Sequence, residues 1–125
     1  MNTAIRKLLI ETARIEGHTI SYSTLNEQCE LGYDFSLDYH RKMIGEDLGE
    51  LSEYEHKAGR PLLSALVVHK GSNYEGDGFY RLCENLGFGD AESLKRNRKT
   101  FDAERKQECY DFWSDEENYK KFKNI

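Results

Sequence analysis

Cysteine, proline and long apolar runs are scarce in this chain of 125 residues, which has three cysteines and one proline. The cysteine count is odd and no two cysteines have C-x-x-C spacing, so we expect buried free thiols rather than a disulfide framework. No apolar run approaches the ~20 residues that cross a bilayer, and the first residues, M-N-T-A-I-R-K-L-L-I-E-T, lack the apolar core of a signal peptide. We therefore expect a cytoplasmic protein with no membrane partner.

The usual sequence signatures of catalytic and cofactor sites are also missing. The four histidines form no H-E-x-x-H motif and no close cysteine–histidine cluster, so we expect no metal site. No G-x-S-x-G motif and no phosphate-binding loop is present, and the apolar periodicity around Cys83 and Cys109 indicates burial rather than nucleophilic reactivity. We therefore predict no catalytic residue and no cofactor.

One small acidic group leaves a metal-dependent nuclease as a less favoured alternative. Glu75 and Asp77 lie close in sequence to His69, and such nucleases use carboxylates to hold Mg²⁺ between the hydrolysing water and the phosphate. The spacing matches no tight motif, however. Two acids in a glycine-rich loop are more often turn and helix-cap residues.

The longest apolar run follows the single proline, Pro61, and we expect the rest of the chain to pack around it. Its small and aliphatic residues, β-branched at the end, predict a buried strand over 62–69. A turn cluster follows over 70–73, and segment 74–78 is expected to return as a strand or a loop. A small β-hairpin fits this pattern, because one strand alone is not stable.

Helical periodicity predicts five or six helices that cover this hairpin. Gly59 and Pro61 end the longest of them, and segment 18–21 is too short to assign but is compatible with a strand. The chain is therefore expected to form one α+β, mostly helical domain over 1–125. Its predicted helices span 3–16, 24–30, 36–57 and 79–86, with a further segment that starts between 90 and 100 and a short piece after 114.

The predicted order of helix, helix, strand, glycine-rich turn and strand is that of a winged helix-turn-helix. We predict a winged-helix-like core over about 3–87 and extra C-terminal helices over about 90–125. Gly45 lies inside the long helix, where glycine costs about 1 kcal/mol. We expect it to let another helix approach closely.

Basic residues cluster in two places, although the net charge of −5 speaks mildly against a nucleic-acid binder. The first cluster is His40, Arg41 and Lys42 in the long helix. The second is the 95–106 segment, with six basic and two acidic side chains. Such a segment is either a solvated helix face or a patch that adds affinity for a phosphate backbone.

Three motifs resemble the DNA-binding half of alkylguanine-DNA alkyltransferases and alkyltransferase-like proteins. They are G-H-T-I-S-Y at 17–22, R-K-M-I-G at 41–45 and R-P-L-L at 60–63, so the similarity covers roughly 15–80. In that family a tyrosine presses on a phosphate beside a flipped base, an arginine replaces that base in the stack, and a cysteine takes the alkyl group. The resemblance implies DNA-contacting roles for Tyr22 and Arg41.

The family's nucleophile has no counterpart in this chain. Its Cys-His-Arg triplet falls on Ser64, Ala65 and Leu66, so the resemblance implies binding without alkyl transfer. The stretch over 53–80 also looks like a group of small bacterial proteins of unassigned function, which adds nothing to the assignment.

The sequence therefore predicts a small non-catalytic DNA-binding protein of winged-helix type. We expect it to contact double-stranded DNA through Tyr22, His40, Arg41, Lys42, Lys95, Arg96, Arg98 and Lys99. The alternative is a protein-interaction or regulatory module with no nucleic-acid role. That alternative is favoured by the net charge and by a patch of exposed C-terminal aromatic residues, namely Tyr110, Phe112, Trp113, Tyr119 and Phe122.

Overall fold

The computed structural model describes residues 1–72, 74 and 76–125, and it confirms a mostly helical α+β chain with 65% of its residues in helices. No helix in these ranges is long and apolar enough to cross a membrane. The elements are α1 (Thr3–Ala13), β1 (Ile20–Ser21), α2 (Tyr22–Gln28), α3 (Asp38–Lys57), the 3-10 helix η1 (Leu63–Leu66), β2 (Val67–Val68), α4 (Asp77–Asn85), α5 (Ala91–Arg96), α6 (Arg98–Trp113) and α7 (Glu116–Phe122).

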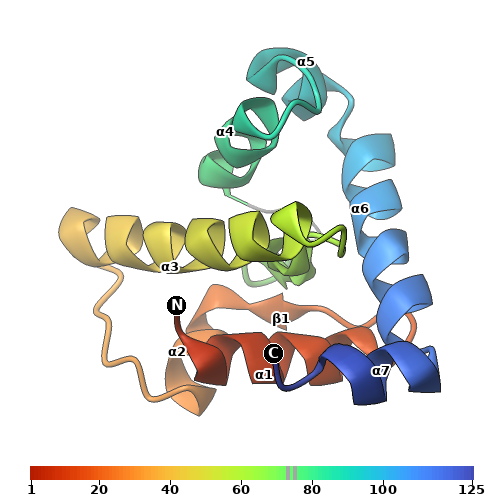
Figure 1. Ribbon diagram of the computed structural model, residues 1–125. Helices are drawn as coiled ribbons and strands as arrows, with labels where there is room; N and C mark the ends of the chain where they lie inside the picture. The colour runs from red at the N-terminus through yellow and green to blue at the C-terminus, as the bar shows by residue number, and fades with distance from the viewer. Residues whose placement is uncertain (73, 75) are drawn as a thin grey trace.

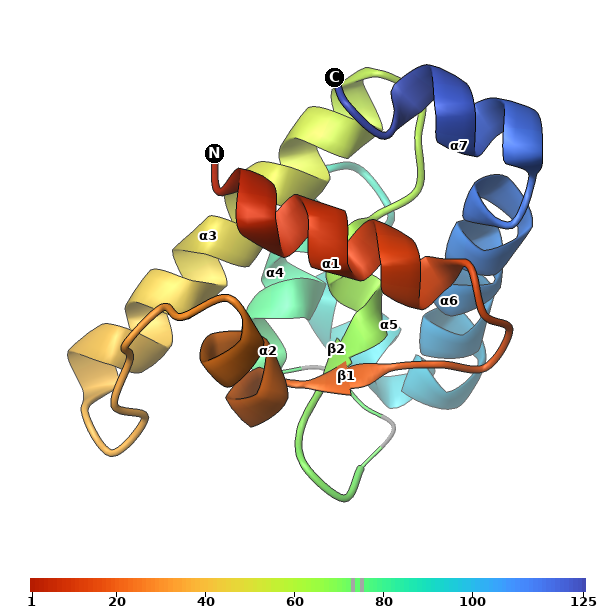
Figure 2. The ribbon, with the colours of Figure 1, turned by 90° about the horizontal axis from the view of Figure 1, so that it is seen from below.

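The long helix α3 runs through the middle of the molecule (Figure 1). Helices α1 and α7 lie on one side of α3, and α4 and α5 lie on the other. Helix α6 runs from the side of α4 and α5 to the side of α1 and α7, and so connects the two sets of helices (Figure 1). Seen from below, β1 and β2 lie side by side, flanked by α2 on one side and α6 on the other (Figure 2).

The apolar run after Pro61 is the buried centre, as the sequence predicted. Every residue from Leu62 to Val68 is buried, and η1 packs against α1, α3 and α6. Seven consecutive buried residues require partners on all sides, and these helices provide them. The main core of the molecule therefore forms around this run.

The run does not form the strand predicted over 62–69, because η1 occupies half of it and only Val67–Val68 forms a strand. Periodicity alone does not separate a buried strand from a short buried helix. In η1 the backbone bonds locally, with the amide of Ala65 donating to the carbonyl of Leu62 at 3.1 Å. The chain turns to the extended conformation where two β-branched valines begin.

The sheet also differs from the predicted hairpin. Strand β2 pairs in parallel with β1, with Ile20 opposite Val67 and Ser21 opposite Val68. Parallel pairing needs a long crossover, and here the crossover contains α2, α3 and η1. A return strand over 74–78 was wrong because α4 already begins at Asp77; positions 73 and 75 of this segment lie outside the described residues.

Two apolar clusters hold the helices together. The main one contains residues of α1, α3 and η1 and also the α6 residues Cys109, Tyr110 and Trp113. The second joins α4 to the start of α6 beneath Leu62 and Ala65. The C-terminal helices therefore share the central core with the N-terminal part of the chain.

Candidate functional site

A groove of about 780 Å³ opens between α3 and the elements around it. This volume lies within the range of about 300–1,000 Å³ that is usual for ligand sites. The groove is built by the start of α2, the exposed face of α3, the loop after β2 and the first turns of α4. Its lining is Tyr22, Ser23, Phe35, Arg41, Lys42, Ile44, Gly45, Glu46, Leu48, Gly49, Ser64, His69, Lys70, Gly76, Gly78, Phe79, Arg81 and Leu82.

The charge of the groove opposes that of the whole protein. Among the described residues that line it, four are cations and one, Glu46, is an acid, whereas the chain as a whole carries −5. Arg41 and Lys42 come from α3, and Lys70 and Arg81 come from the opposite wall. The side chains of Ile44, Leu48, Phe79 and Leu82 supply an apolar part between them. Such a groove fits a ligand with an apolar body and anionic flanks.

Two glycines of α3 help to open the groove. Gly45 and Gly49 are four residues apart and so lie on one helix face, and both line the groove. A Cβ added at either position would meet no atom within 4 Å. The expectation that Gly45 allows a second helix to approach was therefore wrong, because that side of α3 faces the groove instead.

Alanine at both positions, Gly45→Ala with Gly49→Ala, should raise the free energy of unfolding by up to about 1 kcal/mol for each substitution, because alanine favours the helix and meets no atom there. Urea unfolding measures this change. Gly59→Ala is the control: Gly59 has φ +76° just beyond α3, so alanine there should destabilise the fold. A double variant less stable than the wild type would contradict the conclusion that Gly45 and Gly49 face open space in the groove.

Tyr22 occupies the rim of the groove because Ser21 caps α2. The Ser21 side chain accepts a hydrogen bond from the amide of Thr24, so α2 begins at Tyr22, two residues before the predicted start at 24. The Tyr22 hydroxyl accepts a hydrogen bond from the amide of Gly76 at 3.0 Å. Its ring packs against His69, with the ring centroids 5.3 Å apart. Tyr22 therefore joins α2 to the loop after β2.

Arg41 and Lys42 are both exposed at the first turns of α3, as a role in binding requires. The Arg41 guanidinium pairs with Asp38 and donates a hydrogen bond to the carbonyl of Phe35, while its side chain stays 51% exposed. Arg41 is thus oriented by its own helix end but remains accessible from the groove.

His40 does not line the groove. Its Nδ1 accepts a hydrogen bond from the amide of Asp34 at 2.7 Å, and its ring packs on Tyr33 at 5.6 Å. The Tyr33 hydroxyl donates to Asp47 at 2.6 Å, which raises the pKa of Tyr33 to about 12. These contacts tie the 29–37 connection to α3, so His40 orders the helix end.

The second basic cluster adjoins the groove at Asp77. Lys95 pairs with Asp77 at 2.7 Å and holds the pKa of that carboxyl below its usual range, an effect to which Arg81 and His69 also contribute. Arg98 lies over the ring of Tyr74, 4.0 Å from its centroid. The α5–α6 corner and the groove rim therefore form one charged surface.

Arg96 and Lys99 are exposed beside this surface but do not line the groove. Arg96 donates a hydrogen bond to the Ser93 hydroxyl at 3.0 Å.

The group considered as a nuclease site is not assembled as a metal centre in the part of the chain that the structure describes. Asp77 is held by Lys95, His69 packs on Tyr22, and Glu75 lies outside the described residues. Within the described ranges, no group of three or more histidine, cysteine, aspartate or glutamate residues could hold a metal ion.

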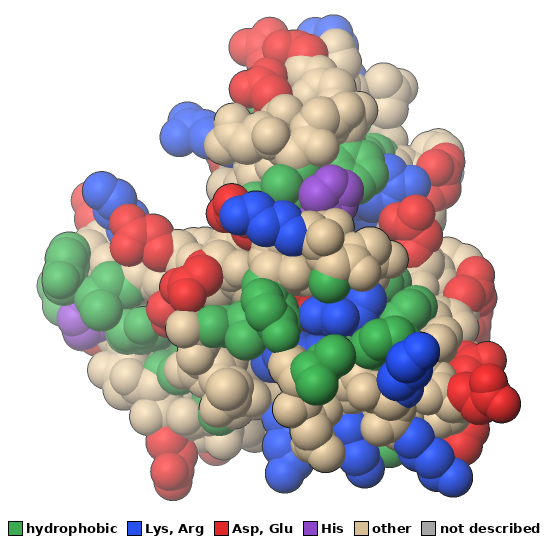
Figure 3. Space-filling view, in the orientation of Figure 1, with side chains coloured by type: hydrophobic (Ala, Val, Ile, Leu, Met, Phe, Trp, Pro, Cys, Tyr) green, Lys and Arg blue, Asp and Glu red, His purple; other side chains and the backbone are tan. Residues whose placement is uncertain are grey.

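The C-terminal aromatic residues do not form the expected exposed patch. Trp113 and Tyr110 are buried, because α6 packs against α1. Phe112, Tyr119 and Phe122 are half-buried and pack on the same core. Two exposed apolar side chains, Leu37 (48%) and Tyr39 (69%), lie together at the N-terminal end of α3, where Figure 3 shows hydrophobic side chains at the surface; Met1, Ile15, Tyr54 and Ile125 are exposed elsewhere.

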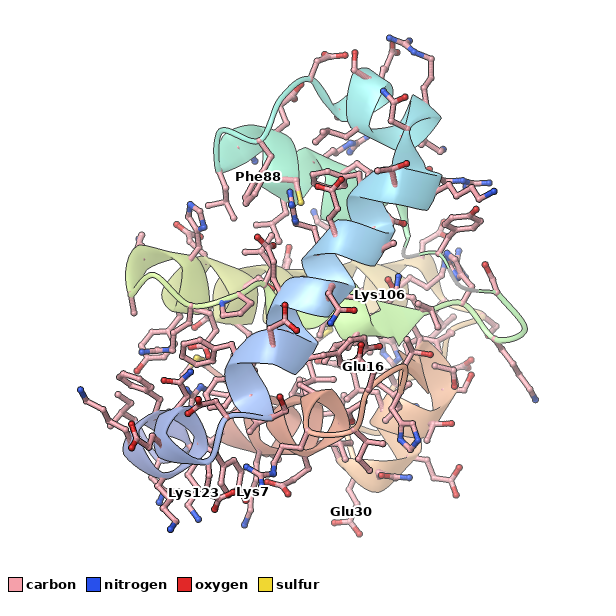
Figure 4. The ribbon with its side chains drawn as sticks, turned by 90° about the vertical axis from the view of Figure 1, so that its right-hand side faces the viewer. Lys7, Glu16, Glu30, Phe88, Lys106 and Lys123 are labelled. Atoms are coloured by element: carbon pink, nitrogen blue, oxygen red, sulfur yellow. The ribbon has the colours of Figure 1, made fainter. Side chains whose placement is uncertain are left out.

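A second, smaller cavity of about 140 Å³ lies between α1 and the C-terminal end of the chain. Lys7 and Lys123 lie side by side at its edge (Figure 4), together with Glu11 and Tyr119. The Tyr119 hydroxyl donates to Glu11 at 2.6 Å. The Glu11 carboxylate is therefore already hydrogen-bonded within the protein. The cavity is also much smaller than the groove.

Of the residues predicted from the sequence to contact DNA, Tyr22, Arg41 and Lys42 line the groove, but much of the lining was not predicted. Lys70, Arg81 and Gly49 line it and were assigned no binding role. The spacing of Gly45 and Gly49 was the one available signal, because two glycines four apart in a helix otherwise only weaken it.

Comparisons with protein-family models, with curated proteins and with solved structures found no match for this chain.

Proposed function

We propose that this protein binds double-stranded DNA without catalysing a reaction, and that its groove receives an unpaired base. The supporting observation is that the three positions singled out by the family resemblance, Tyr22, Arg41 and Ser64, all line one groove. These residues are far apart in sequence, and nothing in their spacing requires them to meet. In this proposal the protein is a winged-helix-type binder, with α3 as the recognition helix and the described residues after β2, among them His69 and Lys70, in the place of the wing.

The chemistry of the groove is consistent with this ligand. Cations on both walls, Arg41 and Lys42 against Lys70 and Arg81, suit the phosphates on either side of a base. The apolar part between them suits the faces of the base. Ser64 provides no nucleophile of the family's kind, because it is a hydroxyl engaged with Ser52 at 2.6 Å.

The first test is the salt dependence of binding, measured by fluorescence anisotropy on a labelled duplex with one unpaired base. We expect binding at low salt that weakens as salt rises. Arg41→Ala with Lys42→Ala should weaken binding and lower the slope of log K against log salt by up to about 2. Lys120→Ala with Lys121→Ala removes the same charge from α7, outside the groove, and should leave the slope nearly unchanged.

No binding at low salt, or equal binding by the Arg41 and Lys42 variant, would end this proposal. The variant with alanine at Gly45 and Gly49 gives an independent test of whether DNA binds in the groove. It should bind the duplex more weakly although it is expected to be more stable, because two methyl groups narrow the groove.

A protein-interaction module is the second candidate. The observation that favours it is the exposed Leu37 and Tyr39 at the N-terminal end of α3. Sedimentation of the purified protein with and without DNA separates the two candidates. Self-association that requires Leu37 and Tyr39, in a protein that binds no DNA, would support the second.

A further inference from the structure

Two buried serines meet behind the groove. Ser52 lies on α3 and is fully buried, and Ser64 lies in η1 and is 5% exposed. Their hydroxyl oxygens are 2.6 Å apart, and the Ser52 hydroxyl also accepts a hydrogen bond from the Ser64 amide at 3.1 Å. Of the two, only Ser64 lines the groove.

The two hydroxyl groups can donate two hydrogen bonds, but only one of these donors is satisfied within the pair. One proton lies between the two oxygens, and the other has no acceptor among the described residues. A serine in a helix often donates to the carbonyl four residues earlier, but among the described residues the Ser52 hydroxyl donates only to Ser64. With Ser52 donating to Ser64, the remaining O–H is that of Ser64, at the groove.

An O–H donor in apolar surroundings is costly when it has no acceptor. The surroundings of Ser64 in the groove include Ile44, Leu48 and Phe79. A ligand that fills the groove and excludes water therefore binds better if it offers an acceptor to this hydroxyl. A ligand of the same shape without an acceptor leaves the donor unpaired and is rejected.

We propose that Ser64 is a specificity-determining donor in the groove, positioned by Ser52, and that the group received there carries a hydrogen-bond acceptor on its inner edge. This inference rests on the proposed function, since it takes an unpaired nucleobase as the occupant. The carbonyl oxygens and ring nitrogens of a base are acceptors of this kind.

The test uses two duplexes that differ only in the central unpaired group, which is thymine in one and its apolar isostere difluorotoluene in the other. We expect the wild-type protein to bind the thymine duplex about 10-fold more tightly, the effect of one unpaired buried donor. In Ser64→Ala the ratio should fall to about one, because the thymine duplex loses its hydrogen bond and the difluorotoluene duplex no longer leaves a buried donor unpaired. Ser64→Thr keeps the hydroxyl and should keep most of the preference.

Ser52→Ala tests the positioning role. It leaves the Ser64 hydroxyl in place but removes the oxygen that orients it, so the ratio should fall below that of the wild type. Urea unfolding of each variant separates a change in the ratio from a loss of fold, because a merely structural role would weaken both duplexes alike.

Equal binding of both duplexes by the wild-type protein would overturn this inference and leave the proposed function standing, and this outcome needs no variant to fold. An undiminished preference in Ser64→Ala would overturn it as well. Failure of the wild type to bind either duplex would instead overturn the proposed function, and this inference with it.

Discussion

Glu55→Ala should lower the free energy of unfolding by about 3–5 kcal/mol, the effect of removing one partner from a buried ionic cluster. The Glu55 side chain is fully buried between two arginines that are themselves almost completely buried. One carboxylate oxygen lies 3.2 Å from Nη2 of Arg6, and the other lies 2.8 Å from Nη2 of Arg60. Alanine would leave two buried guanidinium groups without their counter-ion.

The cluster also holds the end of the chain. Arg6 donates hydrogen bonds to the carbonyls of Phe122 and Lys123, both at 2.9 Å, and its guanidinium lies 5.7 Å from the ring centroid of Trp113. Arginine suits such a site because its planar fork bonds several acceptors at once. Loss of Glu55 should therefore loosen α7 together with the start of α1.

Glu53→Ala is the matched control, because Glu53 lies on the exposed side of the same helix. It pairs with Lys57 at 3.3 Å with spacing i,i+4, and such exposed pairs contribute about 0.3–0.5 kcal/mol. Urea unfolding followed by tryptophan fluorescence measures both variants, since Trp113 lies beside the cluster. A Glu55→Ala protein within about 1 kcal/mol of the wild type would show that the two arginines find other partners.

The sequence predicted the parts of the fold that depend on local pattern. The long helix was expected over 36–57 and is observed as Asp38–Lys57, because Gly59 and Pro61 end it by local chemistry. The burial of 62–68 also followed from composition. The strand pairing did not follow, because β1 and β2 are joined by a crossover of two α-helices and η1 and have only two residues each. Pairs so short are selected by the packing around them.

The candidate site could be predicted only where one segment carried the signal. Arg41 and Lys42 stand together in sequence, and Tyr22 came from a family resemblance. Lys70 and Arg81 each lie alone among turn or apolar residues, so only the fold brings them to the groove. Lys95 was predicted to contact DNA, and its pairing with Asp77 across the α4–α5 corner depends on a contact that no local pattern encodes.

Reversing the charge of Lys70 and Arg81, two groove residues that the sequence did not mark as binding residues, should produce the largest loss of DNA affinity. Lys70→Glu with Arg81→Glu places two carboxylates where the proposed function requires cations beside phosphates. We expect the affinity for the duplex with an unpaired base to fall by about 100-fold at low salt, with a shallower salt dependence. Both side chains are exposed, so the fold should tolerate the exchange.

The control for this variant must carry the same net charge, because the whole protein is acidic and any added acid weakens DNA binding at a distance. Lys120→Glu with Lys121→Glu makes the same change on α7, where both side chains are exposed. Anisotropy titrations at two salt concentrations then compare proteins of equal charge. If both variants lost affinity equally, overall charge and not the groove would govern binding. A loss confined to the Lys70 and Arg81 variant would place the DNA against the side of the groove that carries these two residues.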